Sequence, residues 1–121
     1  MPYTAKHRFA PMSSKKLQPV AKVIRGKSVD NALETLKFMP HRGARLIEKV
    51  IQSARANAED RGLRHPEDLM IQEVRIDGAG MMKRILPGCR GMAHVLHLRQ
   101  CHITVMLEEL GILVGDEESE E

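Results

Sequence analysis

Residues 69–107 decide the fold, and they read LMIQEVRIDGAGMMKRILPGCRGMAHVLHLRQCHITVML. Apolar side chains alternate with other residues near both ends of this stretch, at Met70, Val74, Ile76, Ile103, Val105 and Leu107. A period of two predicts strands with one apolar face each. Residues 78–92 hold four of the nine glycines and break the pattern. We therefore predict two antiparallel strands joined by a long, irregular hairpin over residues 78–96.

This hairpin has too few large apolar residues to bury itself, so it is expected to protrude from the domain. It carries Lys83, Arg84 and Arg90, while Pro87 and the glycines shape its backbone. Lysine and arginine bind phosphates, arginine also stacks on bases, and glycine lets a partner approach the main chain closely. RNA contact is one interpretation of the segment, and a flexible basic surface loop is the other.

An edge strand and a helix are predicted at the start of the chain. Residues 3–10 have extended character and favour a short edge strand. Ser13 or Ser14 can cap a helix over residues 14–26, which ends at a glycine and has one apolar face, formed by Leu17, Val20, Ala21 and Ile24. Pro19 lies past the first turn, so it should kink this helix or mark a later start.

Two further helices precede the strands. Residues 29–39 predict a short helix with Asp30 as N-cap, and its inward face consists of Ala32, Leu33 and Leu36. The segment between His41 and Arg61 predicts a longer helix, because alanine and aliphatic residues recur there at steps of three and four. Aromatic residues make up only 2% of the chain, so the core is expected to consist of Leu, Ile, Val, Ala and Met.

Charge is distributed unevenly along the chain. All 19 Lys and Arg residues lie between Lys6 and Arg99, and residues 1–107 contain nine acidic residues, a formal net charge of +10. Residues 111–121 are acidic and predict a disordered tail. A body this basic is expected to bind a polyanion, with counterion release supplying much of the binding free energy. A basic surface that is merely solvated is the alternative.

Other classes of function lack the residues that they need. Cys89 and Cys101 are too far apart for a CxxC motif and are expected to be free thiols in a reducing cytoplasm. Gly78 and Gly80 lack the third glycine of a dinucleotide-binding motif. The six histidines show no zinc-ligand spacing, no nucleophile is paired with a base, and no segment is typical of a signal peptide or membrane span. We expect a soluble intracellular protein with no metal, no cofactor and no catalytic residue.

Four segments, taken together and in this order, resemble one known family. The segments are AKHRFAPMSSKKLQPVAKVIRGKSVDNALETLKF (5–38), IEKVIQSARANAED (47–60), MMKRILPGCRGMAHVL (81–96) and HITVMLEE (102–109). The sequence is similar, over about residues 5–109, to the bacterial large-subunit ribosomal proteins numbered twenty-two. Several of these segments are specific motifs and not merely compositional likenesses.

The resemblance implies an α+β fold, a two-layer domain of three helices packed on a three-stranded antiparallel sheet with a long protruding β-hairpin. It implies one ribosomal RNA-binding domain over residues 1–110, in the large subunit of the cytoplasmic ribosome. The function would be structural: RNA binding, subunit assembly and shaping of the nascent-peptide exit tunnel. Expected partners are large-subunit ribosomal RNA, neighbouring ribosomal proteins near the tunnel and the nascent peptide, and no homo-oligomer is expected.

The resemblance and the charge pattern together give two sets of candidate residues. Contact with ribosomal RNA is expected from Lys6, His7, Arg8, Lys15, Lys16, Arg25, Lys27, Lys83, Arg84, Arg90 and Arg99. The hairpin that lines the tunnel, and that influences macrolide sensitivity in the family, would include Met82, Lys83, Arg84, Pro87, Gly88, Cys89, Arg90 and Gly91. Asn57 matches a family position at the end of the long helix, and its role is open.

The chain departs from the family pattern at several positions. The hairpin tip is usually richer in basic residues, so Gly88, Cys89 and Met92 predict fewer RNA contacts there. His94 and Leu98 stand where polar or basic residues are common. Two rival classes stay open: an RNA-binding regulator that has left the ribosome, which co-sedimentation with ribosomes would distinguish, and an enzyme with a pocket that the sequence does not reveal.

Overall fold

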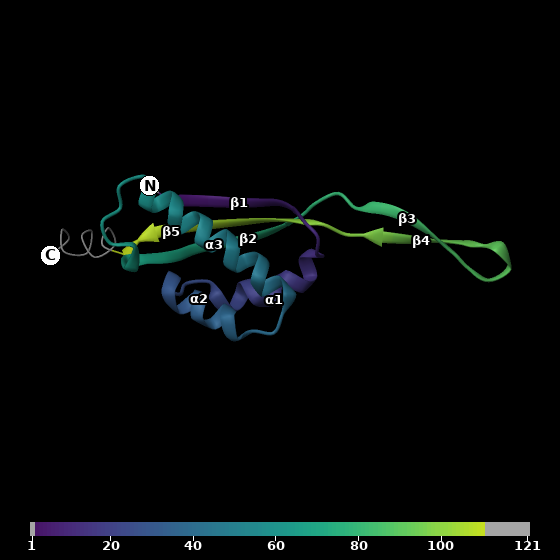
Figure 1. The fold of residues 1–121 in the computed structure, drawn as a ribbon, viewed down its shortest axis with the longest axis horizontal. Coiled ribbons are helices and arrows are strands. Elements are labelled where there is room, and N and C mark those ends of the chain that lie inside the picture. Colours follow the sequence, from purple (N-terminus) through teal and green to yellow (C-terminus); the bar gives the residue numbers. More distant parts are fainter. Residues whose placement is uncertain (1, 111–121) are drawn as a thin grey trace.

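The computed structural model describes residues 2–110, so Met1 and the predicted acidic tail, residues 111–121, lie outside the described residues. Figure 1 shows the arrangement of the elements. In chain order they are β1 (Tyr3–Ala10), α1 (Ser14–Ile24), α2 (Val29–Phe38), α3 (Arg42–Asp60), η1 (Pro66–Asp68), β2 (Leu69–Gly78), β3 (Met82–Pro87), η2 (Cys89–Gly91), β4 (Ala93–Leu98) and β5 (Cys101–Glu109).

The body of the molecule has two layers. β1, β5 and β2 form a three-stranded antiparallel sheet in this order, so β1 is the edge strand that residues 3–10 predicted. α3 packs on β1 and β5, α1 packs on β2, and α2 packs against α3. The three helices therefore cover one face of the sheet, and no element of residues 2–110 covers the other, outer face (Figure 1). The α+β class and the three helices are confirmed.

The strands are divided between two sheets, which corrects the expectation of a single three-stranded sheet. β3 and β4 form a separate two-stranded antiparallel sheet, paired from Met82 opposite Leu98 to Pro87 opposite Ala93. Residues 78–92, expected to be irregular, thus contain a regular strand, because pairing satisfies its backbone groups even where side chains stay exposed. Figure 1 shows this ribbon reaching away from the helices, at the opposite end of the molecule from the start of β1.

The helix boundaries agree with the sequence to within two residues, and the difference in residue assignment concerns the N-cap of α2. α1 begins at Ser14 and continues through Pro19 to its end, so the later start is wrong, and the side chain of its N-cap, Ser13, makes no capping hydrogen bond. α2 is capped by Ser28, whose hydroxyl accepts a hydrogen bond from the Asn31 amide at 3.4 Å. Asp30, expected as the N-cap, is already in the first turn, where a carboxylate interacts favourably with the helix dipole.

The core lies between the two layers, and a β-bulge in β2 decides which of its residues enter it. The register shifts at Gln72, so the buried face changes parity along the strand. The buried residues of β2 are therefore Leu69, Ile71, Val74 and Ile76. Met70 and Met106, expected as core residues, are only half-buried and stand on the outer face. The buried core of residues 2–110 consists of Leu, Ile, Val, Ala and Cys101 and contains no Met.

Candidate nucleic-acid interface

The outer face of the three-stranded sheet carries two of the basic residues predicted for β1. Lys6 and Arg8 are exposed there and line a hollow of about 300 Å³ together with Asp77 of β2 and His102 and Thr104 of β5. Lys6 is paired in register with Thr104, the buried polar residue of the described chain. No ion pair within residues 2–110 involves Lys6 or Arg8. Both cations are therefore available to an anion.

His7 lies on the other side of β1, because side chains alternate along a strand. It is half-buried and pairs in register with the buried Ile103. A second hollow, of about 240 Å³, is lined by Lys6, His7 and Arg8 of β1 together with Lys49 and Ser53 of α3. The three predicted basic residues therefore meet at this edge of the sheet, although Lys6 and Arg8 also line the hollow of the outer face. Lys49, which the sequence did not single out, adds a further cation beside them.

Arg25 and Lys27 have a structural role at the free edge of β2. The guanidinium of Arg25 donates from Nε and Nη2 to the carbonyl of Val74, at 3.1 and 2.7 Å. The amide of Gly26 donates to the carbonyl of Ile71 at 3.2 Å, and the amide of Ile71 donates to the carbonyl of Lys27 at 3.0 Å. This segment therefore covers the edge of the sheet, and part of the Arg25 side chain is committed to it.

Lys16 and Arg99 come together where the hairpin joins the body. Both line a hollow of about 460 Å³ whose other walls include Met12, Met82 and His97. The hollow is bounded by the start of α1 on one side and by the ends of β3 and β4 on the other. Residues that are far apart in the sequence thus form one basic site. Lys15 is also exposed on α1 but does not line this hollow.

The β3–β4 ribbon, called the hairpin below, has two different exposed faces. Directly paired residues of antiparallel strands share a face. One face carries Met82, Arg84, Leu86, His94, Leu96 and Leu98, and the other carries Lys83, Ile85, Pro87, Ala93, Val95 and His97. Every one of these side chains is exposed. Each face therefore offers aliphatic surface and a cation, and neither is packed against the body.

The tip of the hairpin is a tight loop. The amide of Gly88 donates to the carbonyl of Met92 at 2.6 Å, which closes the loop. Arg90 and Gly91 both adopt the left-handed conformation, with φ of +57° and +73°. The structure thus places Gly88, Cys89, Arg90 and Gly91 at the tip, while Met82, Lys83, Arg84 and Pro87 lie along β3.

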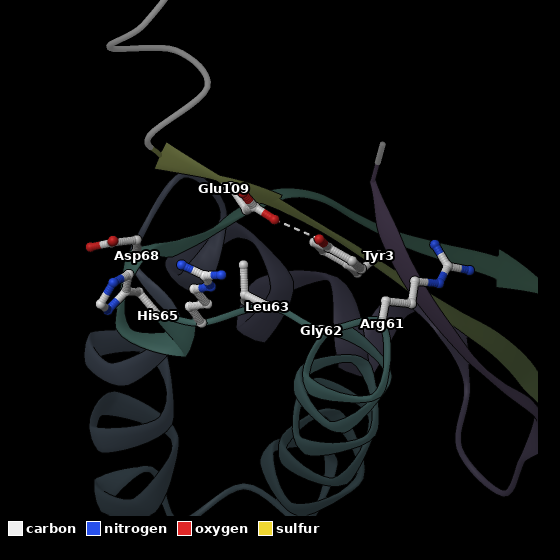
Figure 2. A pocket seen from close by; sticks show the side chains of 8 residues that line it. Tyr3, Arg61, Gly62, Leu63, His65, Asp68 and Glu109 are labelled. Carbon is white, nitrogen blue, oxygen red and sulfur yellow. Dashed lines mark hydrogen bonds between the residues drawn. The ribbon is translucent and has the colours of Figure 1, made fainter.

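Asn57 and Tyr3 connect β1 to its surroundings. The side-chain amide of Asn57, whose role the sequence left open, donates to the carbonyl of Thr4 at 3.0 Å and so ties α3 to the edge strand. Figure 2 shows the hydroxyl of Tyr3 pointing at Glu109, to which it donates a hydrogen bond of 2.5 Å. This bond, together with burial, raises the pKa of Tyr3 above its ordinary value. The guanidinium of Arg61 lies 5.7 Å from the centre of the Tyr3 ring.

The hollow around Tyr3, of about 480 Å³, is similar in size to the hollow at the hairpin base, but its lining is mixed in charge. Arg61, His65, Asp68 and Glu109 all contribute to it (Figure 2). The Tyr3–Glu109 hydrogen bond joins the first strand to the last, which is a structural role. None of the basic residues predicted from the sequence lines this hollow, whereas Lys6, His7, Arg8, Lys16 and Arg99 line the others.

Phe9 and Arg75 are two further surface residues that sequence reasoning missed. Phe9 is exposed and adopts a φ of +58° in a bulge of β1. Arg75 is exposed on the outer face, where its guanidinium forms an ion pair with Glu73 at 3.1 Å. The alternation of the strand could have located Arg75, because Arg75 lies between two buried residues and its side chain must therefore face away from the helices. No comparable signal marked the bulge at Phe9.

Three further features concern metal binding, membrane insertion and thiol chemistry. Within residues 2–110 no group of three or more His, Cys, Asp or Glu side chains could hold a metal ion. Among the described helices, none has the length and apolar character needed to cross a membrane. Cys89 is exposed, whereas Cys101 is buried, and this burial raises the pKa of its thiol.

Comparison with known proteins gives one consistent result. The family described as "Ribosomal protein L22p/L17e" matches residues 5–108. A relative named "Large ribosomal subunit protein uL22" from Rhodopirellula baltica is 46% identical, over 89% of this chain and 95% of the relative. Relatives with the same name from Caldicellulosiruptor saccharolyticus and Geotalea daltonii are 44% and 38% identical, over 88% and 90% of this chain and 87% and 98% of the relatives.

Proposed function

This chain belongs to the L22p/L17e family of ribosomal proteins, and from this premise we propose that it binds large-subunit ribosomal RNA, aids subunit assembly and lines the nascent-peptide exit tunnel with its hairpin. As a member of this family it is a structural component of the large ribosomal subunit and not an enzyme. Its proposed partners are large-subunit ribosomal RNA, neighbouring ribosomal proteins and the nascent peptide.

The exposure of the hairpin is the observation that carries this proposal. All twelve residues of β3 and β4 are exposed, and they include the large apolar side chains of Met82, Ile85, Leu86, Val95, Leu96 and Leu98. An exposed, contiguous apolar surface of this kind marks an interaction site, because water is a poor environment for it. The ribbon has such groups on both faces, so it suits a partner that surrounds it.

The charge of the hairpin indicates what that partner is. No acidic residue occurs between Asp77 and Glu108, whereas Lys83, Arg84 and Arg90 lie on the hairpin. Ribosomal RNA offers phosphates to these cations and base surfaces to the aliphatic side chains. In the proposed tunnel role, the hairpin would be held by RNA and would present its tip and part of one face to the channel.

The body supplies the second part of the proposed RNA interface. Lys6 and Arg8 on the outer face, and Lys16 and Arg99 at the hairpin base, form basic hollows that flank the bulge of β1 and the start of α1. We propose that phosphates occupy both hollows and so set the position of the body and the direction of the hairpin. Lys15, Arg25 and Lys27 would add weaker, more peripheral contacts.

Co-sedimentation with ribosomes tests the proposal. The tagged protein, expressed in bacterial cells, is expected to sediment with the large subunit and to stay there through a high-salt wash. A variant in which residues 81–98 are replaced by a short glycine turn keeps the body, because the Ala79 amide already donates to the Gln100 carbonyl at 3.0 Å across the junction. This variant should be released by the wash.

The charge-only variant Lys83→Gln, Arg84→Gln and Arg90→Gln is the matched control for the loss of the whole ribbon. It should be retained better than the deletion, because its apolar contacts remain. Release of the unmodified protein at moderate salt would contradict the proposal, since it would indicate a peripheral phosphate binder, as expected for an RNA-binding regulator that acts outside the ribosome.

A further inference from the structure

Phe9 is held in a conformation that aromatic residues rarely adopt. β1 contains a bulge in which Arg8 and Phe9 together oppose one residue of β5, because the register passes from His7 opposite Ile103 to Ala10 opposite Cys101. At this bulge the φ of Phe9 is +58°. A positive φ is unfavourable for a residue with a bulky side chain, so the surrounding structure must impose it.

His102 contacts both the backbone and the ring of Phe9 in this conformation. The backbone amide of Phe9 donates to Nδ1 of His102 at 3.1 Å, and the two rings meet edge to face with their centres 4.9 Å apart. The guanidinium of Arg8 lies 5.7 Å from the centre of the Phe9 ring. The bulge is therefore fixed through both the backbone and the ring.

Burial of the ring does not explain the strained backbone. The Phe9 side chain remains 54% exposed, so most of its apolar surface faces water. Strained, exposed residues that the fold holds in place are typical of binding sites, where the position of the side chain matters more than its burial. The strain at Phe9 serves to present the ring and not to hide it.

The surroundings of the ring indicate what it contacts. His102 and Arg8, which touch the ring, also line the hollow of the outer face, and Lys6 stands in the same hollow. An exposed aromatic ring beside cations on an open sheet is the arrangement with which proteins bind unpaired RNA, since the ring stacks on a base and the cations bind the adjacent phosphates.

We propose that Phe9 stacks on an unpaired base of ribosomal RNA, while Lys6 and Arg8 bind the phosphates that flank this base. The inference rests on the proposed function, because it assigns one nucleotide-binding position within the proposed RNA interface. RNA fits this site better than an acidic peptide does. A peptide carboxylate could pair with Lys6 or Arg8 as a phosphate does, but it offers no base-sized flat surface to the ring, and Asp77 in the same hollow repels either anion alike.

Phe9→Gly tests the proposal without endangering the fold. Glycine adopts a positive φ without strain, so this variant should unfold at the same urea concentration as the wild type or at a higher one. The probe is a short single-stranded RNA of mixed sequence, compared with the same strand carrying abasic nucleotides. Phe9→Gly should bind the normal strand about five- to a hundredfold more weakly than the wild type does, the range expected for one base stacked on an aromatic ring.

The abasic strand separates stacking from charge, because it keeps the phosphates and lacks the bases. Wild type and Phe9→Gly should bind it equally well. Equal affinities of the two proteins for the normal strand would overturn the assignment of Phe9 while leaving RNA binding intact. If the wild-type protein bound neither strand, the proposed RNA-binding function itself would fail, and this inference with it.

Tryptophan fluorescence gives an independent reading, since the chain has no Trp. In Phe9→Trp the normal strand should quench the fluorescence, and the abasic strand should not. Phe38→Trp is the matched control, because Phe38 at the end of α2 is even more exposed, at 88%, and lies on the helical layer. Equal quenching at both positions would indicate non-specific association and would overturn the assignment.

Discussion

The imidazole of His94 lies directly over Gly88 at the tip of the hairpin. A methyl group on Gly88 would overlap Cδ2 and Nε2 of this ring and would stand 3.0 Å from the carbonyl oxygen of Met92. Gly88 and His94 are both positions at which the sequence departs from the family pattern that it resembles. The structure shows that these two departures touch each other, so the tip of this hairpin has its own internal packing.

Gly88→Ala should displace the His94 ring without unfolding the protein. The backbone φ at Gly88 is −111°, which alanine adopts easily, so the cost lies in moving one exposed side chain and in a small shift of the Met92 carbonyl. The free energy of unfolding should change by less than about 0.5 kcal/mol. NMR chemical shifts of the His94 ring report the displacement, and Gly88→Ala in a His94→Ala background should shift the tip amides less than in the wild-type background, because only the contact with the Met92 carbonyl remains. Unaltered His94 signals in the single variant would contradict the packing described.

Arg25 should matter for stability through its shape and not only through its charge. Arg25→Ala removes both hydrogen bonds to the Val74 carbonyl and is expected to lower the free energy of unfolding by about 1–2 kcal/mol in urea titrations. Arg25→Lys keeps the charge but loses the forked donor, so it should recover little of this loss. Lys22→Ala, an exposed change on the same helix, is the control. Full recovery by lysine would indicate a general charge effect.

The Tyr3–Glu109 hydrogen bond should give stability that disappears in strong alkali. Tyr3→Phe removes it and is expected to cost about 0.5–1.5 kcal/mol at neutral pH. Because the bond raises the pKa of Tyr3 above 10.0, folding favours the protonated phenol. Its contribution is complete below pH 10.0 and is lost as the pH rises through the folded-state pKa.

Urea unfolding of wild type and Tyr3→Phe across this pH range measures the effect. Tyr3 is the only tyrosine in the chain, so its tyrosinate absorbance follows the same titration directly. A difference in stability between the two proteins that stays constant well above pH 10.0 would show that the hydrogen bond is not the cause.

The two cysteines should report on different parts of the molecule. Cys89 is exposed at the hairpin tip and should react quickly with iodoacetamide, whereas Cys101 is buried and its raised thiol pKa further lowers the fraction of reactive thiolate. Peptide mass mapping after brief alkylation distinguishes them, and urea should expose Cys101. In assembled large subunits Cys89 should react more slowly than in the free protein, because the proposed channel narrows access to the tip. An undiminished rate of alkylation there would mean that the tip stands free in solvent.

The sequence predicts the body of the fold well because its elements are periodic. Apolar spacing located α3 and the main strands, and Gly26 and Gly62 end their helices at positive φ, as expected of C-terminal glycines. Two predictions that were wrong, the buried position of Met70 and the N-cap of α2, failed for local reasons. The bulge at Gln72 moved Met70 out of the core, and a hydroxyl at Ser28 caps α2 in place of Asp30. The position of a bulge and the identity of a capping residue depend on contacts between elements, and a single sequence does not show these contacts.

The sequence predicted basic residues for the candidate site, but it did not predict which of them lie together in space. Lys16 and Arg99 lie far apart in the sequence and meet only because the hairpin base stands next to α1. Arg25 has a basic side chain that the sequence assigned to RNA, yet its guanidinium caps Val74. Phe9 appeared to be an ordinary strand residue, because a bulge leaves no mark in the apolar pattern. Side-chain chemistry could be anticipated, but the local backbone could not.

Amide hydrogen exchange should separate the hairpin from the body in the free protein. The amides of β3 and β4 have hydrogen-bond partners only across a two-stranded ribbon whose side chains are all exposed, so opening them exposes no buried surface. The amides of α3 open only when the core is disrupted, because the helix packs on β1 and β5. Residues 80–92 should therefore exchange by local opening, orders of magnitude faster than those of α3.

In purified large subunits the hairpin should reach the protection of α3, since RNA on both faces would have to move before the ribbon could open. Equal protection of hairpin and α3 in the free protein would mean that the hairpin is stable by itself, and its order could then not be attributed to RNA.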